Sequence, residues 1–239
     1  MTMEMKKILK NINFKIKKGE IIALIGENGS GKTTLTKLIL GLYPPSEGTL
    51  KFCNNCYFLY STSYILSKIA IYLQDNYIFH ATIQENIGFG NIKQISNHKL
   101  IVDSLYKSGG INILNKMPKG FDTWLKRDVN QEGVTLSGGE EQKIGIARLL
   151  ISNKDIYIFD EPGASLDPIS EVEQLFNIKN SLKEKTIIFI THRIGLAKLA
   201  DRIFVLDKGE LIEEGSHDKL FKQKGKYTEF YLQQSSWYD

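Results

Sequence analysis

The sequence of 239 residues is long enough to bury a sizeable core, and at roughly 150 residues per domain it allows one large domain or a core with a subdomain. Hydrophobic residues make up 42% of the chain and charged residues 24%, with 5 Pro and 20 Gly, which excludes disordered, collagen-like and disulfide-scaffold proteins. No stretch approaches the roughly 20 apolar residues of a membrane helix, and the basic start lacks the apolar run of a signal peptide. We therefore expect a cytosolic globular chain.

The net charge of +4 comes from lysines and arginines that are scattered along the chain, which argues against a nucleic-acid surface. The only two cysteines, Cys53 and Cys56, flank two asparagines. They could form a redox pair or half of a zinc site, but no second cysteine pair exists and the four histidines are dispersed. Because Asn-Asn between two β-prone segments is typical of a turn, a polar surface turn is the favoured interpretation.

The first elements predicted are a hairpin, a strand and a helix. Apolar and polar residues alternate over 12–16, and a polar turn leads into the apolar run 21–25, which together predict a hairpin that ends in a buried strand. The glycine-rich segment 26–33 comes next. Leu35, Leu38, Ile39 and Leu42 then have helical spacing, and we expect Pro44-Pro45 to stop the helix.

The middle of the chain is predicted to be mainly helical. Residues 49–52 and 69–73 have the pattern of short strands, and helical segments follow from 83 to about 115. Ser137 and Glu140 have the spacing of a capping box, so a helix should begin there.

Buried strands and helices alternate in the last third of the chain. Residues 156–159, 186–190 and 203–206 are apolar on both faces, and a helix should start at Asp167-Pro168, with Asp as N-cap. The alternation predicts an α/β fold with a mainly parallel sheet. We expect a single domain, with residues 1–75 and 153–239 as the core and β subdomain and about 76–152 as an inserted α-helical subdomain.

The strongest motif is Gly26-Glu-Asn-Gly-Ser-Gly-Lys-Thr33, which matches the phosphate-binding loop (P-loop) pattern between a predicted strand and helix. Its glycines allow main-chain N–H groups to converge on phosphate oxygens, and the helix N-terminus adds favourable partial charge. Lys32 would reach the β and γ phosphates, and the Thr33 hydroxyl would coordinate Mg²⁺. The motif alone leaves kinases, GTPases and many ATPases open.

Four further motifs follow in order: Gln74 after the strand 69–73, Leu136-Ser-Gly-Gly-Glu140 at a helix start, Asp160-Glu161 at the end of a strand, and His192 after the strand 186–190. With the P-loop and the segment 164–167, this ordered set resembles the ATP-binding cassette (ABC) family over nearly the whole chain. The resemblance implies a RecA-like P-loop NTPase core with an antiparallel β region and an inserted helical subdomain.

The resemblance implies a role for each motif, with ATP and Mg²⁺ as the bound groups. Catalysis would use Glu161 as general base, together with His192, Gln74 and Lys32. Mg²⁺ would be held by Thr33, Gln74 and Asp160. The nucleotide would contact Gly26, Glu27, Asn28, Gly29, Ser30, Gly31, Lys32, Thr33, Thr34, Ser137, Gly138, Gly139 and Asp167.

The resemblance also implies partners. The helix start at Ser137 offers a second anion site, which in the family closes on ATP held by another cassette in a head-to-tail dimer. The segment from Gln74 to Gly90 resembles exporter cassettes, in which it lines a groove for the coupling helix of a transmembrane domain. Tyr77 and Phe79 would suit that groove, although aromatics near a strand end are about as often core. Residues 116–123 and 213–218 are exporter-like, and 126–134 resembles bacterial peptide and lantibiotic exporters more than multidrug exporters.

The sequence departs from the family in having no aromatic residue before Phe14, where family members stack one on adenine. Either the chain is cut from a longer exporter or it is a shortened cassette with weakened adenine binding, and we favour the former. We expect the ATPase subunit or domain of an exporter, at the cytoplasmic face of the plasma membrane and without nucleic acid. The rival interpretations are a soluble cassette ATPase that acts on nucleic acid or ribosomes, and a non-catalytic regulatory cassette.

Overall fold

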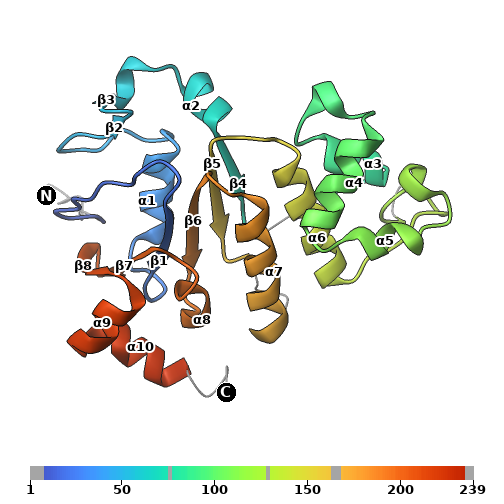
Figure 1. The fold of residues 1–239 in the computed structure, drawn as a ribbon. Helices are drawn as coiled ribbons and strands as arrows, with labels where there is room; N and C mark the ends of the chain where they lie inside the picture. The colour runs from blue at the N-terminus through green and yellow to red at the C-terminus, as the bar shows by residue number, and fades with distance from the viewer. Residues whose placement is uncertain (1–7, 75–76, 128–129, 163–167, 235–239) are drawn as a thin grey trace, which may run out of the picture. The chain divides into compact units, whose positions relative to one another are not determined.

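The computed structural model describes residues 8–74, 77–127, 130–162 and 168–234 (Figure 1). The chain divides into two compact units. The first, here the core unit, comprises Met1–Ala70, Lys154–Ile158 and Glu184–Asp239. The second, here the helical unit, comprises Ile71–Asn153 and Phe159–Lys183.

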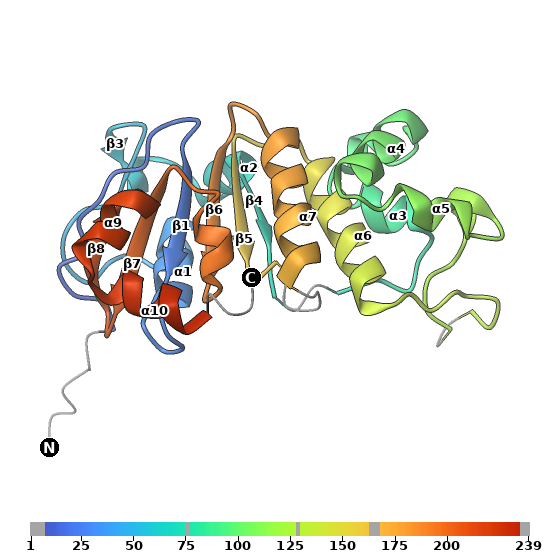
Figure 2. The same cartoon turned by 60° about the horizontal axis from the view of Figure 1, so that its bottom comes forward.

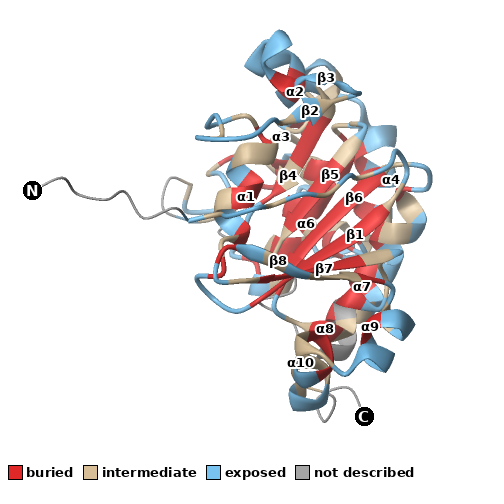
Figure 3. Ribbon diagram, turned by 90° about the vertical axis from the view of Figure 1, so that its left-hand side faces the viewer, coloured by how far each residue is buried: buried red, intermediate tan, exposed pale blue. Residues whose placement is uncertain are grey.

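Among the described residues, the main sheet has six strands in the order β4-β5-β6-β1-β7-β8. Their bounds are β1 (Ile21–Ile25), β4 (Ile69–Tyr72), β5 (Ile156–Asp160), β6 (Thr186–Thr191), β7 (Arg202–Asp207) and β8 (Glu210–Gly215). Strand β1 pairs in parallel with both β6 and β7, and β8 adds to β7 in antiparallel orientation. Every residue of β1 and β6 is buried (Figure 3). The predicted α/β fold with a mainly parallel sheet is therefore confirmed.

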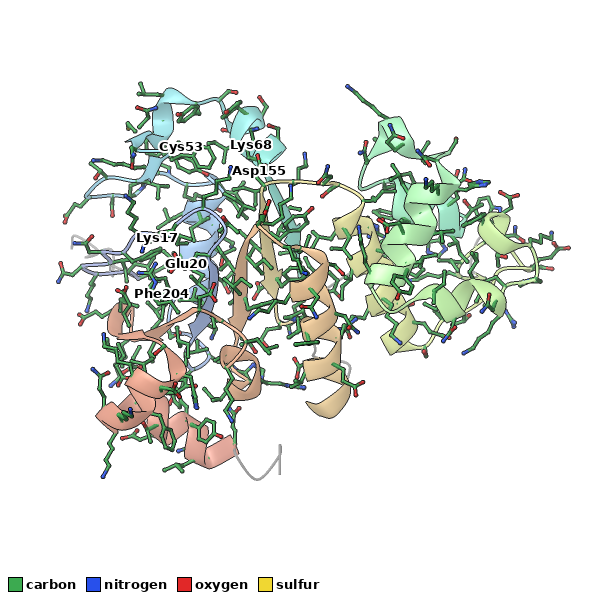
Figure 4. All side chains as sticks on the ribbon, viewed as in Figure 1. Lys17, Glu20, Cys53, Lys68, Asp155 and Phe204 are labelled. Atoms are coloured by element: carbon green, nitrogen blue, oxygen red, sulfur yellow. The ribbon has the colours of Figure 1, made fainter. Side chains whose placement is uncertain are left out.

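The predicted hairpin between residues 12–16 and 21–25 is wrong, because both edges of β1 are occupied by β6 and β7. The alternation of apolar and polar residues over 12–16 arises from packing and not from strand pairing. The Phe14 ring packs on Phe204 of β7, with 4.9 Å between the ring centroids. Lys17 to Glu20 still forms the expected turn, in which the Glu20 carboxylate accepts the Lys17 main-chain N–H at 2.7 Å (Figure 4).

Helices of the core unit cover the sheet around β1. Helix α1 (Lys32–Ile39) follows the P-loop segment, and α8 (Ile194–Ala197) contacts β1 and β6. Helix α9 (His217–Gln223) packs on β8, and α10 (Lys226–Gln234) packs on α8 and α9 (Figure 2).

A small antiparallel sheet, β2 (Lys51–Phe52) with β3 (Asn55–Cys56), carries the two cysteines. Cys53 and Asn54 form its turn with φ of +49° and +66°, the left-handed pair that a type I′ hairpin turn requires. Both cysteines are free and exposed, and Cys53 is labelled in Figure 4. Within the described ranges no group of three His, Cys, Asp or Glu residues could hold a metal ion. The exposed turn at Cys53 and Asn54 confirms the favoured interpretation as a polar surface turn.

After this sheet come the 3₁₀ turn η1 (Tyr57–Leu59) and α2 (Thr62–Lys68), whose last residue Lys68 pairs with Asp155 at 3.3 Å, both in the core unit (Figure 4). The helical unit holds α3 (Ile83–Gly88), η2 (Ile92–Gln94), α4 (His98–Lys107), α5 (Ile111–Asn115), η3 (Gly120–Asp122), α6 (Gly138–Leu150) and α7 (Pro168–Ser181). Its core is built mostly of isoleucine and leucine from α3, α4 and α6. Among the described residues, no helix combines the length and apolar character needed to cross a membrane.

Helices α1 and α4 end in the same way. In each, a glycine with positive φ follows the C-cap, Gly41 at +69° and Gly109 at +71°. In each, two main-chain N–H groups return to carbonyls of the last turn, which is the Schellman arrangement. The surroundings differ, because a Cβ on Gly41 would lie 2.7 Å from the Tyr57 ring, whereas one on Gly109 would meet nothing within 4 Å. Thus α1 ends at Ile39, and Gly41 turns the chain away from the helix before Pro44-Pro45.

This pair predicts a difference between two matched substitutions. Gly109→Ala should lower the free energy of unfolding by about 1–2 kcal/mol, the cost of a left-handed alanine. Gly41→Ala should lower the free energy of unfolding by at least about 1 kcal/mol more than Gly109→Ala, because the ring of buried Tyr57 cannot move away from the new Cβ. Urea denaturation followed by circular dichroism measures both, and equal losses would contradict the steric argument.

Candidate functional site

Parallel pairing brings the P-loop and His192 to one edge of the sheet. Ile25, the last residue of β1, lies opposite Thr191, the last residue of β6. Gly26 and His192 therefore leave adjacent strand ends in the same direction. The carboxyl edge of an α/β sheet is where ligands bind in this class of fold.

The P-loop is tightly seated on the core unit. A Cβ on Gly26 would lie 2.2 Å from the Leu206 carbonyl oxygen, so only glycine fits there. Gly31, with φ of +108°, is the N-cap of α1. Ser30 is 4% exposed, and its hydroxyl has no hydrogen-bond partner among the described residues. A buried hydroxyl without a partner beside a helix N-terminus fits a loop that is completed by an anion.

Lys32 folds back over the loop that precedes it. Its buried ammonium group donates to the main-chain oxygens of Gly26 at 2.7 Å and Glu27 at 3.0 Å. Thr33 is exposed and Thr34 half-buried in the first turn of α1, where main-chain N–H groups have no partner within the helix. Glu27, Asn28 and Gly29 are exposed on the outer side of the loop.

The turn at Lys208-Gly209, which was not predicted from the sequence, holds the P-loop by a hydrogen bond. The Gly209 N–H, between β7 and β8, donates to the Ser30 carbonyl at 2.9 Å. The Gly209 carbonyl accepts from Lys10 N–H at 2.7 Å, and a Cβ on Gly209 would lie 2.0 Å from the Ile8 carbonyl oxygen. Lys208-Gly209, a polar residue followed by glycine between two β segments, was the available turn signal.

In the helical unit, Gln74 and the two carboxylates follow neighbouring strands. Gln74 is exposed two residues beyond β4, and β4 is the sheet neighbour of β5. Asp160 ends β5, and the next residue, Glu161, has φ of +50°. A left-handed glutamate is uncommon and is of the kind that clusters at functional sites. Both carboxylates are half-buried.

The signature segment begins α6 as predicted. The Ser137 hydroxyl accepts the Glu140 N–H, and the Glu140 carboxylate accepts the Ser137 N–H at 3.0 Å, which completes a capping box. This bond to the Ser137 N–H lowers the pKa of the Glu140 carboxyl below its usual value, with Lys116 at 3.2 Å adding to the effect. Gly138 is exposed and Gly139 half-buried, while Asp167 lies outside the described residues.

The exporter-like segment from Gln74 to Gly90 is held by two residues that the sequence analysis did not single out. Buried Asn86 accepts Phe79 N–H at 2.9 Å and donates to the Phe79, Ala81 and Thr82 carbonyls. Arg148 of α6 donates to both oxygens of Asn86 at 2.6 and 2.9 Å and to the Tyr77 carbonyl at 2.8 Å. No local sequence signal could have found these partners, since they lie 62 and 71 positions apart.

Arg148 also shapes an aromatic surface. Its guanidinium lies 4.7 Å from the centre of the Phe79 ring, and Phe79 makes edge contacts with Tyr77 and Phe89. These three rings are exposed, so Tyr77 and Phe79 are surface and not core residues. Burial lowers the pKa of Arg148 to about 10, which leaves it charged at neutral pH.

The structure thus assembles two groups of the predicted site residues. The P-loop residues from Gly26 to Thr34 and His192 belong to the core unit. Gln74, Asp160, Glu161 and the residues from Ser137 to Gly139 belong to the helical unit.

Comparison with known proteins agrees with these features. The family model described as "ABC transporter" matches residues 9–164. The leukotoxin export ATP-binding protein LtxB of Aggregatibacter actinomycetemcomitans is 38% identical over 228 residues, which are 95% of this chain and 31% of that protein. The alpha-hemolysin translocation ATP-binding protein HlyB of Escherichia coli is 37% identical over 229 residues, 95% of this chain and 32% of that protein.

A solved structure of a bacterial Atm1-family ABC exporter with ATP bound superimposes with a TM-score of 0.87 at 30% identity. The match covers 97% of this chain and 39% of that one. This chain spans about a third of the length of the curated relatives that it matches.

The contacts of Arg148 predict a large effect of its removal. Arg148→Ala should lower the free energy of unfolding by about 2–4 kcal/mol, because carbonyls of Tyr77 and Asn86 lose a charged donor. Arg148→Lys should recover less than half, since one ammonium group cannot replace three nitrogens held in a fork. Lys143→Ala, on the same helix, is the control and should stay within about 0.5 kcal/mol of the wild type in chemical denaturation. Equal effects at positions 143 and 148 would rule out the anchoring role.

Proposed function

Since this chain belongs to the ABC transporter family, in which it is an ATP-binding ATPase domain, we propose that its hydrolysis of ATP drives export by a membrane-spanning partner. The observation that carries the proposal is the similarity, over 95% of the chain, to ATP-binding proteins of toxin exporters. Because those relatives are named for leukotoxin and hemolysin, we propose a polypeptide as the exported substrate. The chain would then work at the cytoplasmic face of a membrane.

Triphosphate binding is assigned to the P-loop of the core unit. N–H groups at the start of α1 would donate to phosphate oxygens, and the Ser30 hydroxyl would gain the partner that it lacks. Lys32 would exchange the Gly26 and Glu27 carbonyls for β and γ phosphate oxygens, which are better acceptors for an ammonium group.

The donors of Thr33, Gln74 and Asp160 fit Mg²⁺. All three are hard oxygen donors, and Mg²⁺ in phosphate sites is held by few protein oxygens together with phosphates and water. When bound, the ion neutralises charge that develops on the phosphate oxygens. We assign these residues to hold it.

Hydrolysis requires a base and precise alignment. The Glu161 carboxylate would accept a proton from the attacking water. At the same time the water oxygen bonds to the γ phosphorus, and the bond between the γ phosphorus and the ADP oxygen breaks. His192 would orient the γ phosphate and Gln74 the water. Lys32 stabilises the charge on the leaving oxygens, so catalysis is mainly positioning and electrostatics.

The helix start at Ser137, Gly138 and Gly139 is proposed to contact ATP held by a second cassette, with Asp167 near the interface. A helix N-terminus favours an anion, and the P-loop already supplies one for the ATP bound by the same chain. The exposed aromatic surface of Tyr77, Phe79 and Phe89 is the proposed contact for the membrane-spanning partner.

Glu161→Gln tests the catalytic assignment. The variant should bind ATP with Mg²⁺ but lose at least about 100-fold in turnover, because the amide cannot accept the proton of water. In the presence of ATP, this variant should then accumulate as a dimer, which light scattering detects as a doubling of mass. Unchanged hydrolysis would remove Glu161 from the mechanism.

A mixing experiment tests the shared site. Lys32→Ala and Ser137→Arg proteins should each be inactive alone, while their heterodimer retains one intact site. The mixture should therefore regain up to about a quarter of wild-type activity on statistical pairing. No gain over either variant, under conditions in which the wild type is active, would contradict head-to-tail pairing.

A further inference from the structure

The last residue of α10 contacts the main chain beside His192. The side-chain amide of Gln234 donates from Nε2 to the His192 carbonyl oxygen at 2.8 Å. Its Oε1 accepts the Ile194 main-chain N–H at 2.9 Å. Because one planar amide makes both bonds, it fixes the separation and orientation of these two main-chain groups.

The segment from His192 to Ile194 needs such partners, because His192 and Arg193 lie between β6 and α8 and Ile194, the first residue of α8, has no acceptor for its N–H within the helix. Within this segment, the Arg193 main-chain N–H donates to the nearby Thr191 hydroxyl at 2.9 Å. Ile194 is 1% exposed and packs in a core cluster with Ala197 and Tyr227. The main chain at His192 is therefore held by the burial of Ile194 in the core and by the two hydrogen bonds of Gln234.

Helix α10 is itself fixed, so Gln234 has a defined position. At its start, the Glu213 carboxylate accepts the N–H groups of Lys226 at 2.5 Å and Tyr227 at 3.1 Å. The buried Tyr227 hydroxyl bonds to His217 Nδ1 at 2.7 Å. One turn later, the Tyr231 hydroxyl accepts from Lys198 at 2.6 Å. These contacts hold the helix along its length.

We propose that Gln234 is a positioning residue for His192 in ATP hydrolysis. The inference rests on the proposed role of His192 toward the γ phosphate. Gln234 would not touch the nucleotide, and it would act by holding the His192 main chain so that the imidazole emerges at the edge where β1 ends. Displacements of about 1 Å in such a group can cost about 100-fold in rate.

The test compares Gln234→Leu with Gln233→Leu in the full chain. Gln233 is exposed on the same helix, so its replacement controls for a change in helix composition. Gln234→Leu should lower kcat for ATP about 10-fold to 100-fold while KM for ATP stays within about 3-fold, because the P-loop is untouched. Gln233→Leu should retain wild-type kinetics. A kcat for Gln234→Leu within 2-fold of the wild type would overturn the inference.

Gln234→Glu separates positioning from packing. Glutamate keeps the length and the acceptor for Ile194 N–H but places an acceptor, not a donor, against the His192 carbonyl. Its kcat should fall as for Gln234→Leu while thermal unfolding changes little. Wild-type kcat in Gln234→Glu would also overturn the inference, even if the leucine variant failed to fold.

A double-mutant cycle with His192→Ala distinguishes this inference from the proposed function. If Gln234 acts through His192, adding Gln234→Leu to His192→Ala should cause no further loss of kcat, whereas independent effects would multiply. Multiplied losses would overturn the positioning role. Full turnover by His192→Ala alone would refute the proposed function of His192. If His192→Ala loses turnover but Gln234→Leu keeps it, only the positioning role is refuted.

Discussion

The pairing of β1 along both of its edges is the constraint on which the candidate site depends. Because β6 and β7 both run parallel to β1, three strands of the core unit end at one edge, where Gly26 and His192 follow. Every residue of β1 is buried, so a shift of the strand by one residue would bring the polar Glu20 or the P-loop residue Gly26 into its buried stretch. The strand pairing that stabilises the sheet therefore also fixes the position of the P-loop.

Loops that follow strands need hydrogen-bond partners that the sheet cannot give them. Buried main-chain groups are nearly always paired, and here distant side chains and turns supply the pairs. Gly209 supports the P-loop, Gln234 supports the chain after His192, and Asn86 with Arg148 supports the segment after Gln74. The irregular backbone can thus hold defined positions without being part of a strand or helix.

Local signals in the sequence predicted the elements and motifs well. The P-loop between strand and helix and the Ser137–Glu140 capping box depend on neighbours in sequence, so they could be found. The predicted hairpin over 12–25 is wrong because alternation indicates a half-buried segment and not the segment it pairs with. Half-buried Phe14 packs on the ring of Phe204 in β7. Strand β8 was missed because its edge position allows glutamates at three of six places. Arg148 and Gln234 carry no local signal, since their partners are main-chain atoms far along the chain.

We infer that the P-loop at the end of β1 binds triphosphate and that Lys32, which here donates to two loop carbonyls, moves to the phosphates when nucleotide binds. A crystal structure of the chain with Mg²⁺ and a non-hydrolysable ATP analogue tests it most directly. The triphosphate should lie against the N–H groups at the start of α1, and Lys32 Nζ should have left the Gly26 and Glu27 oxygens for phosphate oxygens. A nucleotide bound elsewhere, with Lys32 still on both carbonyls, would contradict it.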